Sequence, residues 1–330
     1  MDSDQSFRLG TRGSQLALYQ ARLVARLLAD NGGPTCEIVV IKTAGDRLQD
    51  RALSEVGGKS LFVKELEDAL LGEEIDLAVH SSKDMPAVLP DGLSIAGVLA
   101  REDPRDALVL PASAGGPRLS TLEELVATLG QTPSIATGSV RRVAQLIRVF
   151  PGATFAPIRG NLDTRLRKLD TGEYSALVLA VAGLRRLGFE SRITLTLPTG
   201  VCLPAPGQGI VAVETRAGDD GLRKALAAIS DPTAAAALEA ERALVETLGG
   251  GCQTPIGALA TPIDQDTLEL VAAVVAIDGS RAVRSVARGS RDQAAGIGER
   301  AAHQLVAEGA CQILEEARRS NRAGQGVHGQ

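Results

Sequence analysis

A chain of 330 residues with 44% hydrophobic and 23% charged residues has an ordinary globular composition, and its length allows two or three domains with separate cores. The formal net charge of -5 and the 2% aromatic content argue against a general nucleic-acid binder, which needs basic surface and stacking platforms. No apolar run is long enough to cross a membrane, and the polar, acidic start is unlike a signal peptide, so we expect a cytoplasmic protein. The scattered cysteines (Cys36, Cys202, Cys252 and Cys311) form no CxxC pair and predict reduced thiols without disulfides or zinc.

The first residues predict a βαβ unit. A strand at 7–11 runs into Thr11-Arg12-Gly13-Ser14, where Ser14 is placed to cap a helix, and a continuous apolar strand follows at 36–41. The polar segment 43–58 contains three glycines and shows no period, which predicts a mobile lid with Phe62 near its base.

A helix from Ser60 and a buried strand at 75–79 lead directly into the run His80-Ser81-Ser82-Lys83-Asp84-Met85-Pro86, and a strand at 93–99 follows. Ligands gather beyond the carboxyl ends of strands in open parallel α/β sheets. Lys83 and Asp84 are therefore candidate binding residues, although a solvated turn with a local ion pair would explain the same spacing.

Two segments interrupt this pattern and predict crossings between lobes. The first is the charged break 101–106, and the second is the Pro/Gly-rich stretch Leu203–Gly209. Between them we expect strands at 107–110, 134–136, 153–156 and 176–180, with helices from Leu122, Val140, Leu162 and Val181. A strand at 210–214 is placed to return to the first sheet. Two crossings around paired α/β units suggest two lobes around a cleft.

The remainder predicts a smaller α+β unit. A helix covers 234–248, strands cover 257–260, 267–275 and 281–288, and one closing helix covers 294–319. The polar tail 320–330 is expected to be disordered. The expected domains are 1–104 with 210–228, then 105–209, then 229–330.

The loop between that helix and the first of those strands holds Gly249, Gly250, Gly251 and Cys252. Glycines allow positive φ and close backbone approach, and Pro255 prevents helix continuation. The loop therefore predicts a bare thiol able to carry a covalent group. A small buried cysteine near a turn is the alternative.

Arginines recur where strands end and helices begin. Arg12 follows the first strand, Arg141 and Arg142 follow Thr137-Gly138-Ser139, and Arg165 follows Arg159-Gly160-Asn161, while Arg185 and Arg186 end a short helix. Cations at helix N-termini are mildly unfavourable, so their recurrence favours a polyanionic ligand, and the arginine fork suits carboxylates. Surface arginines in an arginine-rich chain are the alternative. No GxxxxGK[ST] loop supports nucleotide phosphate.

These motifs together resemble the porphobilinogen deaminase (hydroxymethylbilane synthase) family over about residues 7–260. The matching segments are 11–17, 56–67, 78–86, 101–106, 137–142, 159–165, 205–209 and 249–257. Gly138 stands where the family pattern leads us to expect Ser, and Gln15 where it leads us to expect Pro.

The resemblance implies an α/β fold of two doubly wound, periplasmic-binding-protein-like domains flanking a cleft, plus a smaller C-terminal α+β domain. It implies a monomeric transferase that joins four porphobilinogen molecules into linear hydroxymethylbilane, releasing ammonia, in tetrapyrrole (haem-type) biosynthesis. The primer would be one dipyrromethane cofactor, held by a thioether to Cys252, and no metal is required. Asp84 would be catalytic, serving the ring nitrogens.

The same resemblance, with the charge argument, gives two sets of expected site residues. The cofactor-binding set is Lys83, Asp84, Thr137, Ser139, Arg141, Arg142, Arg159, Gly160, Arg165 and Cys252. The substrate-binding set is Arg12, Ser14, Phe62, Arg159, Arg186 and Gln208. The competing interpretation is a two-lobed carboxylate-binding protein or regulatory ligand-binding domain without catalysis, against which the Cys252 loop counts.

Overall fold

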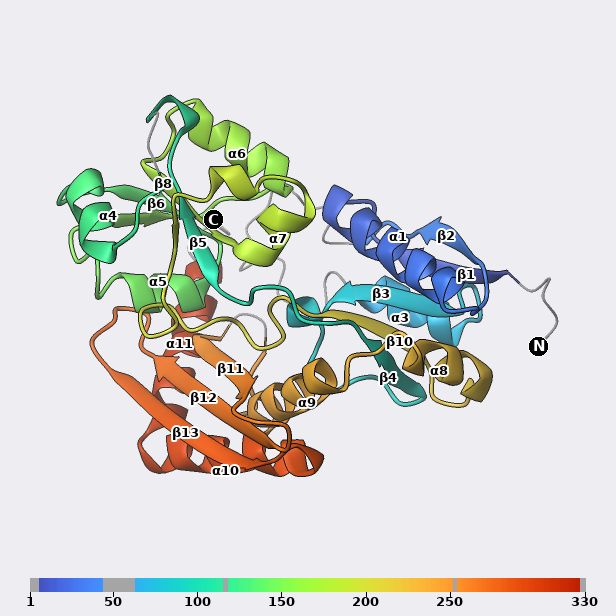
Figure 1. Cartoon of the computed structure of the whole chain (residues 1–330). Helices are drawn as coiled ribbons and strands as arrows, with labels where there is room; N and C mark the ends of the chain where they lie inside the picture. Colours follow the sequence, from blue (N-terminus) through green and yellow to red (C-terminus); the bar gives the residue numbers. More distant parts are fainter. Residues whose placement is uncertain (1–5, 44–62, 115–117, 252–253, 327–330) are drawn as a thin grey trace.

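The computed structural model describes residues 6–43, 63–114, 118–251 and 254–326, and these residues form three β-sheets with helices packed on them (Figure 1). Within these ranges, no helix combines the length and apolar character needed to cross a membrane.

The first sheet has the strand order β2-β1-β3-β10-β4. Its strands are β1 (Phe7–Thr11), β2 (Cys36–Val40), β3 (Leu77–Ser81), β4 (Leu93–Val98) and β10 (Val211–Arg216). β1 is parallel to β2 and β3, whereas β10 is antiparallel to β3 and β4. Helices α1 (Gln15–Asp30) and α8 (Asp220–Ala227) cover one face and α3 (Lys64–Leu71) the other. The predicted strand at 210–214 does return to this sheet.

The second sheet has the order β7-β6-β8-β5-β9. Its strands are β5 (Asp106–Val109), β6 (Ser134–Ala136), β7 (Thr154–Ala156), β8 (Ala176–Ala180) and β9 (Leu195–Thr196). One face packs on α6 (Leu162–Asp170) and α7 (Val181–Arg186), and the other on α4 (Leu122–Leu129) and α5 (Val140–Leu146). Helices on both faces of both sheets confirm the predicted doubly wound α/β class.

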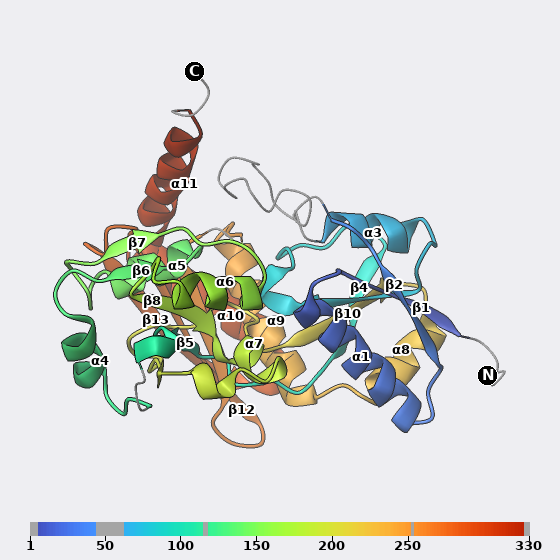
Figure 2. The ribbon, with the colours of Figure 1, turned by 90° about the horizontal axis from the view of Figure 1, so that it is seen from above.

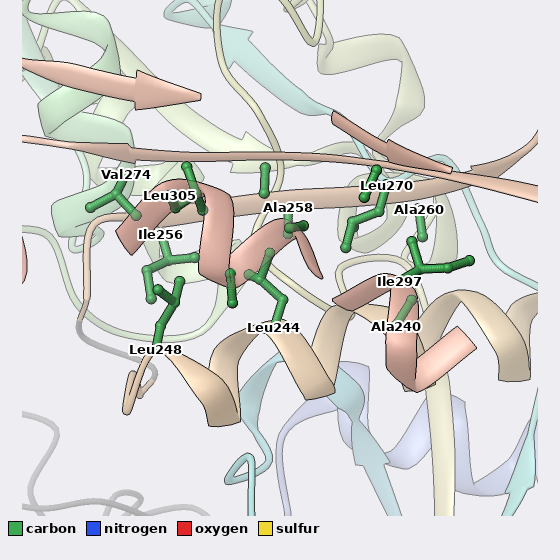
Figure 3. Close-up of a cluster of buried hydrophobic side chains, with 14 of the residues drawn as sticks. Ala240, Leu244, Leu248, Ile256, Ala258, Ala260, Leu270, Val274, Ile297 and Leu305 are labelled. Atoms are coloured by element: carbon green, nitrogen blue, oxygen red, sulfur yellow. The ribbon is translucent and has the colours of Figure 1, made fainter. Parts of the chain in front are cut away.

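The third sheet is antiparallel and smaller. It contains β11 (Ile256–Pro262), β12 (Thr267–Val275) and β13 (Ala282–Ser290). Helices α9 (Pro232–Thr247), α10 (Ala294–Ala307) and α11 (Ala310–Gly326) pack against one face. Their core is built from Ala, Leu, Ile and Val alone, including Leu244, Ile256, Leu270 and Ile297 (Figure 3). The other face meets α5 of the second unit through Val275 and Ala144.

Several element predictions were wrong. The single helix expected at 294–319 is broken, because Gly309 adopts φ +96°, a left-handed conformation that ends α10. The tail expected to be disordered from 320 is helical as far as Gly326, and α11 projects beyond the sheets (Figure 2). The strand expected at 75–79 lies at 77–81, because the Ile75 amide bonds to Ala69 O in the turn after α3. Helix α8 and strand β9 were not predicted.

One buried carboxylate links both crossings, 101–106 and 203–209, to the third unit through hydrogen bonds. Glu241 of α9 is fully buried, and its oxygens accept from Gly207 N at 2.6 Å, Ala260 N at 2.8 Å and Arg101 Nη1 at 2.6 Å. Arg101 Nε also donates to Gln208 O at 2.9 Å. Because a buried charge is tolerated only when it is fully paired, this network fixes the junction where the three units meet.

Candidate functional site

The run that follows β3 forms a short 3-10 turn, Ser82–Asp84, at the junction. Gly207 of the second crossing packs on it, since a Cβ at that glycine would lie 2.6 Å from Ser82 Oγ, and its φ is +74°. Only glycine combines that conformation with so close an approach. The two motifs predicted to lie at a strand end and at a crossing are therefore packed together.

Lys83 lies partly buried at this junction, with two cations, Arg141 and Arg142, and two anions, Asp84 and Asp106, near it. Its Nζ donates to Gln208 Oε1 at 3.4 Å. Burial lowers the pKa of Lys83 to about 8; Arg142 and Arg141 lower it further, while Asp84 and Asp106 act in the opposite direction. A bound anion beside Lys83 would stabilise the charged form of Lys83 and so offset the cost of burial and the repulsion from the two arginines.

Arg141 and Arg142 share one buried counterion, Asp106, at the start of β5. Arg141 Nη1 lies 2.7 Å from Asp106 Oδ2, and Arg142 Nη2 lies 2.7 Å from Oδ1. Although burial opposes ionisation, the two guanidinium groups hold the pKa of Asp106 well below its usual range. Asp106 thus offsets part of the positive charge of this pair in the first turn of α5, an arrangement that the sequence alone did not predict.

The two arginines differ in what they have left to donate. All three nitrogens of the Arg142 guanidinium are engaged, with Nη1 on Val178 O at 2.8 Å and Nε and Nη2 on Asp106. Arg141 uses Nη1 alone, on Asp106, on Leu203 O at 2.7 Å and on the Cys202 sulfur. Of the two, Arg141 has the greater remaining capacity to bind an external carboxylate.

We expect Asp106→Asn to lower the free energy of unfolding by about 3–5 kcal/mol, because it leaves two buried guanidinium groups without a counterion. Urea unfolding followed by circular dichroism measures this. Asp103→Asn is the control, since its guanidinium partners Arg105 and Arg185 are 44% and 35% exposed, and a pair with such an exposed arginine contributes about 1 kcal/mol or less. Equal losses in the two variants would contradict the buried-counterion interpretation.

Arg165 extends the positive region toward Asp84. Its Nε donates to Gly160 O at 2.8 Å, and Gly160 adopts φ +102°. Burial lowers the pKa of Arg165 to about 10; Arg142 and Arg159 lower it further, and Asp84 opposes them. Asp84 therefore lies in the same electrostatic neighbourhood as the arginines from two separate motifs of the second unit.

Two cavities open on either side of the Ser82–Asp84 turn. The larger has about 620 Å³ of space and is lined by residues of all three units, among them Lys83, Ser139, Arg141, Gly251 and Thr254. The smaller has about 400 Å³ and brings together Arg12, Ser14 and Asp84. Two adjacent residues of this turn therefore line different cavities, Lys83 the larger and Asp84 the smaller.

The remaining predicted residues are held mostly by protein groups. Ser139 caps α5 and accepts from Arg142 N, while Thr137 Oγ1 accepts from Ser139 N at 3.2 Å. Arg186 Nη2 donates to Gly209 O at 2.7 Å, and burial lowers its pKa. Gln208 Nε2 donates to Pro104 O at 2.7 Å and to Asp106 Oδ1 at 2.9 Å. The side-chain oxygen of Gln208 accepts from Lys83, so both ends of this amide are bonded to protein groups. Gln208 therefore holds Lys83 and Asp106 in position relative to each other.

The glycine loop is partly described. Gly249 adopts φ +58°, a left-handed conformation that favours glycine, and a Cβ on Gly250 would lie 2.6 Å from Ile256 Cδ1, so a larger residue there would require that side chain to shift. Gly251 and Thr254, which line the larger cavity, bond to each other through Thr254 N and Gly251 O at 3.0 Å. Cys252, Phe62 and the predicted lid from residue 44 to 58 lie outside the described residues.

Sequence reasoning overlooked two residues of this region. Asp106 was read as part of a charged break, and no signal in the sequence pairs it with Arg141 and Arg142. Arg242 of α9 lines the larger cavity beside Lys83 and Arg141. The signal for Arg242 in the sequence would have been a cation within the helix that leads into the Cys252 loop.

The chain matches two models of protein families. The first, described as porphobilinogen deaminase, dipyrromethane cofactor binding domain, covers residues 7–224, and the second, porphobilinogen deaminase, C-terminal domain, covers residues 235–307. Among solved structures, the VFT2 domain of BvgS from Bordetella pertussis is 17% identical, with 68% of this chain and 86% of that one covered and a TM-score of 0.40.

Curated relatives agree with the family models. A porphobilinogen deaminase of Syntrophobacter fumaroxidans is 44% identical over 319 residues, which cover 96% of this chain and 100% of that protein. One from Bordetella parapertussis is 46% identical over 318 residues, covering 96% and 98%. One from Roseiflexus castenholzii is 44% identical over 310 residues, covering 94% and 98%. On this evidence, the chain belongs to the porphobilinogen deaminase family.

Proposed function

We propose that this chain is a transferase that joins four porphobilinogen molecules head to tail into linear hydroxymethylbilane and releases ammonia, working on a dipyrromethane group held covalently by Cys252. The observation that carries the proposal, beside the family membership, is a cluster of buried and partly buried cations that outnumber the neighbouring anions Asp84 and Asp106. These cations are Lys83, Arg141, Arg142 and Arg165. A growing chain with two carboxylates on every pyrrole is the kind of ligand that such a site requires.

The described residues fit a dipyrromethane group. Lys83 and Arg165 both have pKa values lowered by burial and by neighbouring cations, so bound carboxylates would restore the charge balance. Arg141, with donors remaining, and Ser139 line the larger cavity together with the residues that flank Cys252. The residues proposed to hold the group are Cys252, Lys83, Asp84, Thr137, Ser139, Arg141, Arg142, Arg159, Gly160 and Arg165. When bound, the group supplies the nucleophilic pyrrole carbon to which the first substrate unit is joined.

Asp84 is the proposed catalytic residue. Positive charge develops on porphobilinogen as ammonia leaves its aminomethyl carbon, and a carboxylate beside the pyrrole N–H stabilises that charge. The same carboxylate can handle the proton lost from the attacking ring carbon. Its place at the end of β3, against the smaller cavity, suits this role, because the backbone of the turn is held by Gly207 on one side and the sheet on the other.

Arg12 and Ser14 are proposed to bind the incoming substrate beside Asp84, and Phe62, Arg159 and Arg186 to complete that site. Arg12 and Ser14 line the smaller cavity. Gln208 was expected to contact substrate; its hydrogen bonds to Lys83, Pro104 and Asp106 support a positioning role instead. The arginine fork and the hydroxyl of Ser14 suit a carboxylate.

Intact mass and product analysis test the proposal. The purified protein should weigh more than its sequence by two pyrrole units, and porphobilinogen should give ammonia and hydroxymethylbilane. A mass equal to that of the sequence, with carboxylate binding but no ammonia, would favour the non-catalytic binding protein and contradict the transferase.

We further propose a cytoplasmic monomer with domains 1–104 plus 210–228, 105–209 and 229–330. Each of the three sheets draws its strands from one of these domains. The described thiols of Cys36, Cys202 and Cys311 are unpaired with one another, which suits a reducing compartment.

A further inference from the structure

Arg242 is a cation on the α9 wall of the larger cavity. Its Nη2 donates to Ala87 O at 2.7 Å, and in the described part of the chain this is its one recorded hydrogen bond, with no ion pair. Glu214 and Glu246 lie near enough to influence it, yet burial prevails and lowers the pKa of Arg242. The side chain is thus partly buried, with most of its five N–H donors available for another partner.

The surroundings of Arg242 indicate what that partner is. The other α9 residues that line the cavity, Leu238 and Val245, are apolar, and neutral Thr254 and Ile256 follow on the same wall. Lys83 and Arg141 line the cavity from the other two domains. Among the described lining residues, the C-terminal domain therefore contributes a single cation, and no described lining residue is an acid. A ligand with two or more anionic groups could pair with Arg242 on one wall of the cavity and with Lys83 or Arg141 on the other.

We propose that Arg242 binds a carboxylate of a pyrrole unit in this cavity. The C-terminal domain would then bind the pyrrole chain directly, in addition to carrying the cysteine to which that chain is attached. The inference rests on the proposed function. Each pyrrole carries two carboxylates, so one can reach Lys83 or Arg141 while the other reaches Arg242. Two sources supply this chemistry: the dipyrromethane itself and the units added to it.

The experiment compares the wild type with Arg242→Leu, Arg242→Gln and Arg300→Leu. Arg300 is the matched control, because it lies in the same domain, outside the cavity, and also donates to one backbone carbonyl, Arg288 O at 3.2 Å. Arg242→Gln keeps an N–H donor for Ala87 and removes the charge. Circular dichroism establishes folding, and if Arg242→Leu does not fold, Arg242→Gln is read alone.

Intact mass is measured twice on each protein. The first measurement gives the fraction of chains that carry two pyrrole units as purified. The second follows further mass increments against the concentration of added porphobilinogen. Loss of one charged hydrogen bond should raise the half-saturating concentration, or lower the loaded fraction, about tenfold or more.

The two mass measurements distinguish the possible roles of Arg242. A low loaded fraction in the Arg242 variants assigns Arg242 to the dipyrromethane. Normal loading with a tenfold higher concentration for further increments assigns it to the added units. Arg242 variants that match both the wild type and Arg300→Leu in both measurements overturn the inference while leaving the proposed function intact. A wild type without added mass overturns both.

Discussion

Replacing Cys252 by serine is expected to give a folded protein that carries no dipyrromethane and has no measurable turnover. A thioether needs a thiolate, and serine offers none. Two of the other thiols, those of Cys36 and Cys202, are poor substitutes. Burial, followed by the influence of Asp76, raises the pKa of Cys36 to about 11, and burial, followed by Asp106, raises that of Cys202 to about 12. Neither forms a thiolate near neutral pH.

Intact mass and peptide mapping check this expectation. In the wild type, the added mass should lie on the peptide that contains Cys252. Cys311→Ser is the matched control, because Cys311 is exposed on α11 and should be replaceable without loss of the added mass or of activity. A Cys252→Ser protein with full activity and the same added mass would show that the attachment lies elsewhere.

Asp84→Asn is expected to lower kcat by roughly 10²–10⁴-fold with little change in KM. The substitution keeps the shape of the side chain and removes its charge, so the stabilisation of developing positive charge should suffer more than the binding of the neutral pyrrole ring. Lys83 and Arg165 would also lose a nearby anion, since Asp84 favours the charged form of each.

Steady-state kinetics on protein that has been shown to carry its added mass measures this effect, so that failure to load is not mistaken for failure to turn over. Asp91→Asn, in the exposed turn before β4, is the control and should leave both constants unchanged. A loss confined to KM would mean that Asp84 binds substrate without taking part in the chemistry.

The sequence predicted the α/β architecture because its strands are short segments rich in apolar residues, such as ALVLA at 176–180, with turn residues at their ends. The strands at 134–136 and 176–180 and the starts of α5, α6 and α7 were predicted at the correct residues. The helix break at Gly309 was missed, because one glycine in a periodic helical pattern is compatible with a continuous helix. β9, with two residues, is too short to show any period.

The candidate site was predictable only as a set of motifs. The sequence placed Lys83 and Asp84 at a strand end, and the structure places both in one turn, each at a different cavity. It did not predict that Arg141 and Arg142 share Asp106 as a counterion, because that pairing depends on contacts between residues about 35 positions apart. Arg242 was not predicted as a site residue, because it lies in a helix whose alanine-rich sequence indicates only a packing role.

The position of β10 has a consequence for how the nascent chain folds during synthesis. β10 lies between β3 and β4, so residues 211–216 must leave the ribosome before β3 gains its second neighbour and before β4 gains any neighbour in the sheet. Every strand of the second sheet, which ends at Thr196, is already available by then. The middle domain can therefore be completed first, while β3 and β4, synthesised earlier, present unpaired edges of the kind that promote aggregation. A chain truncated before Val211 would retain those edges permanently.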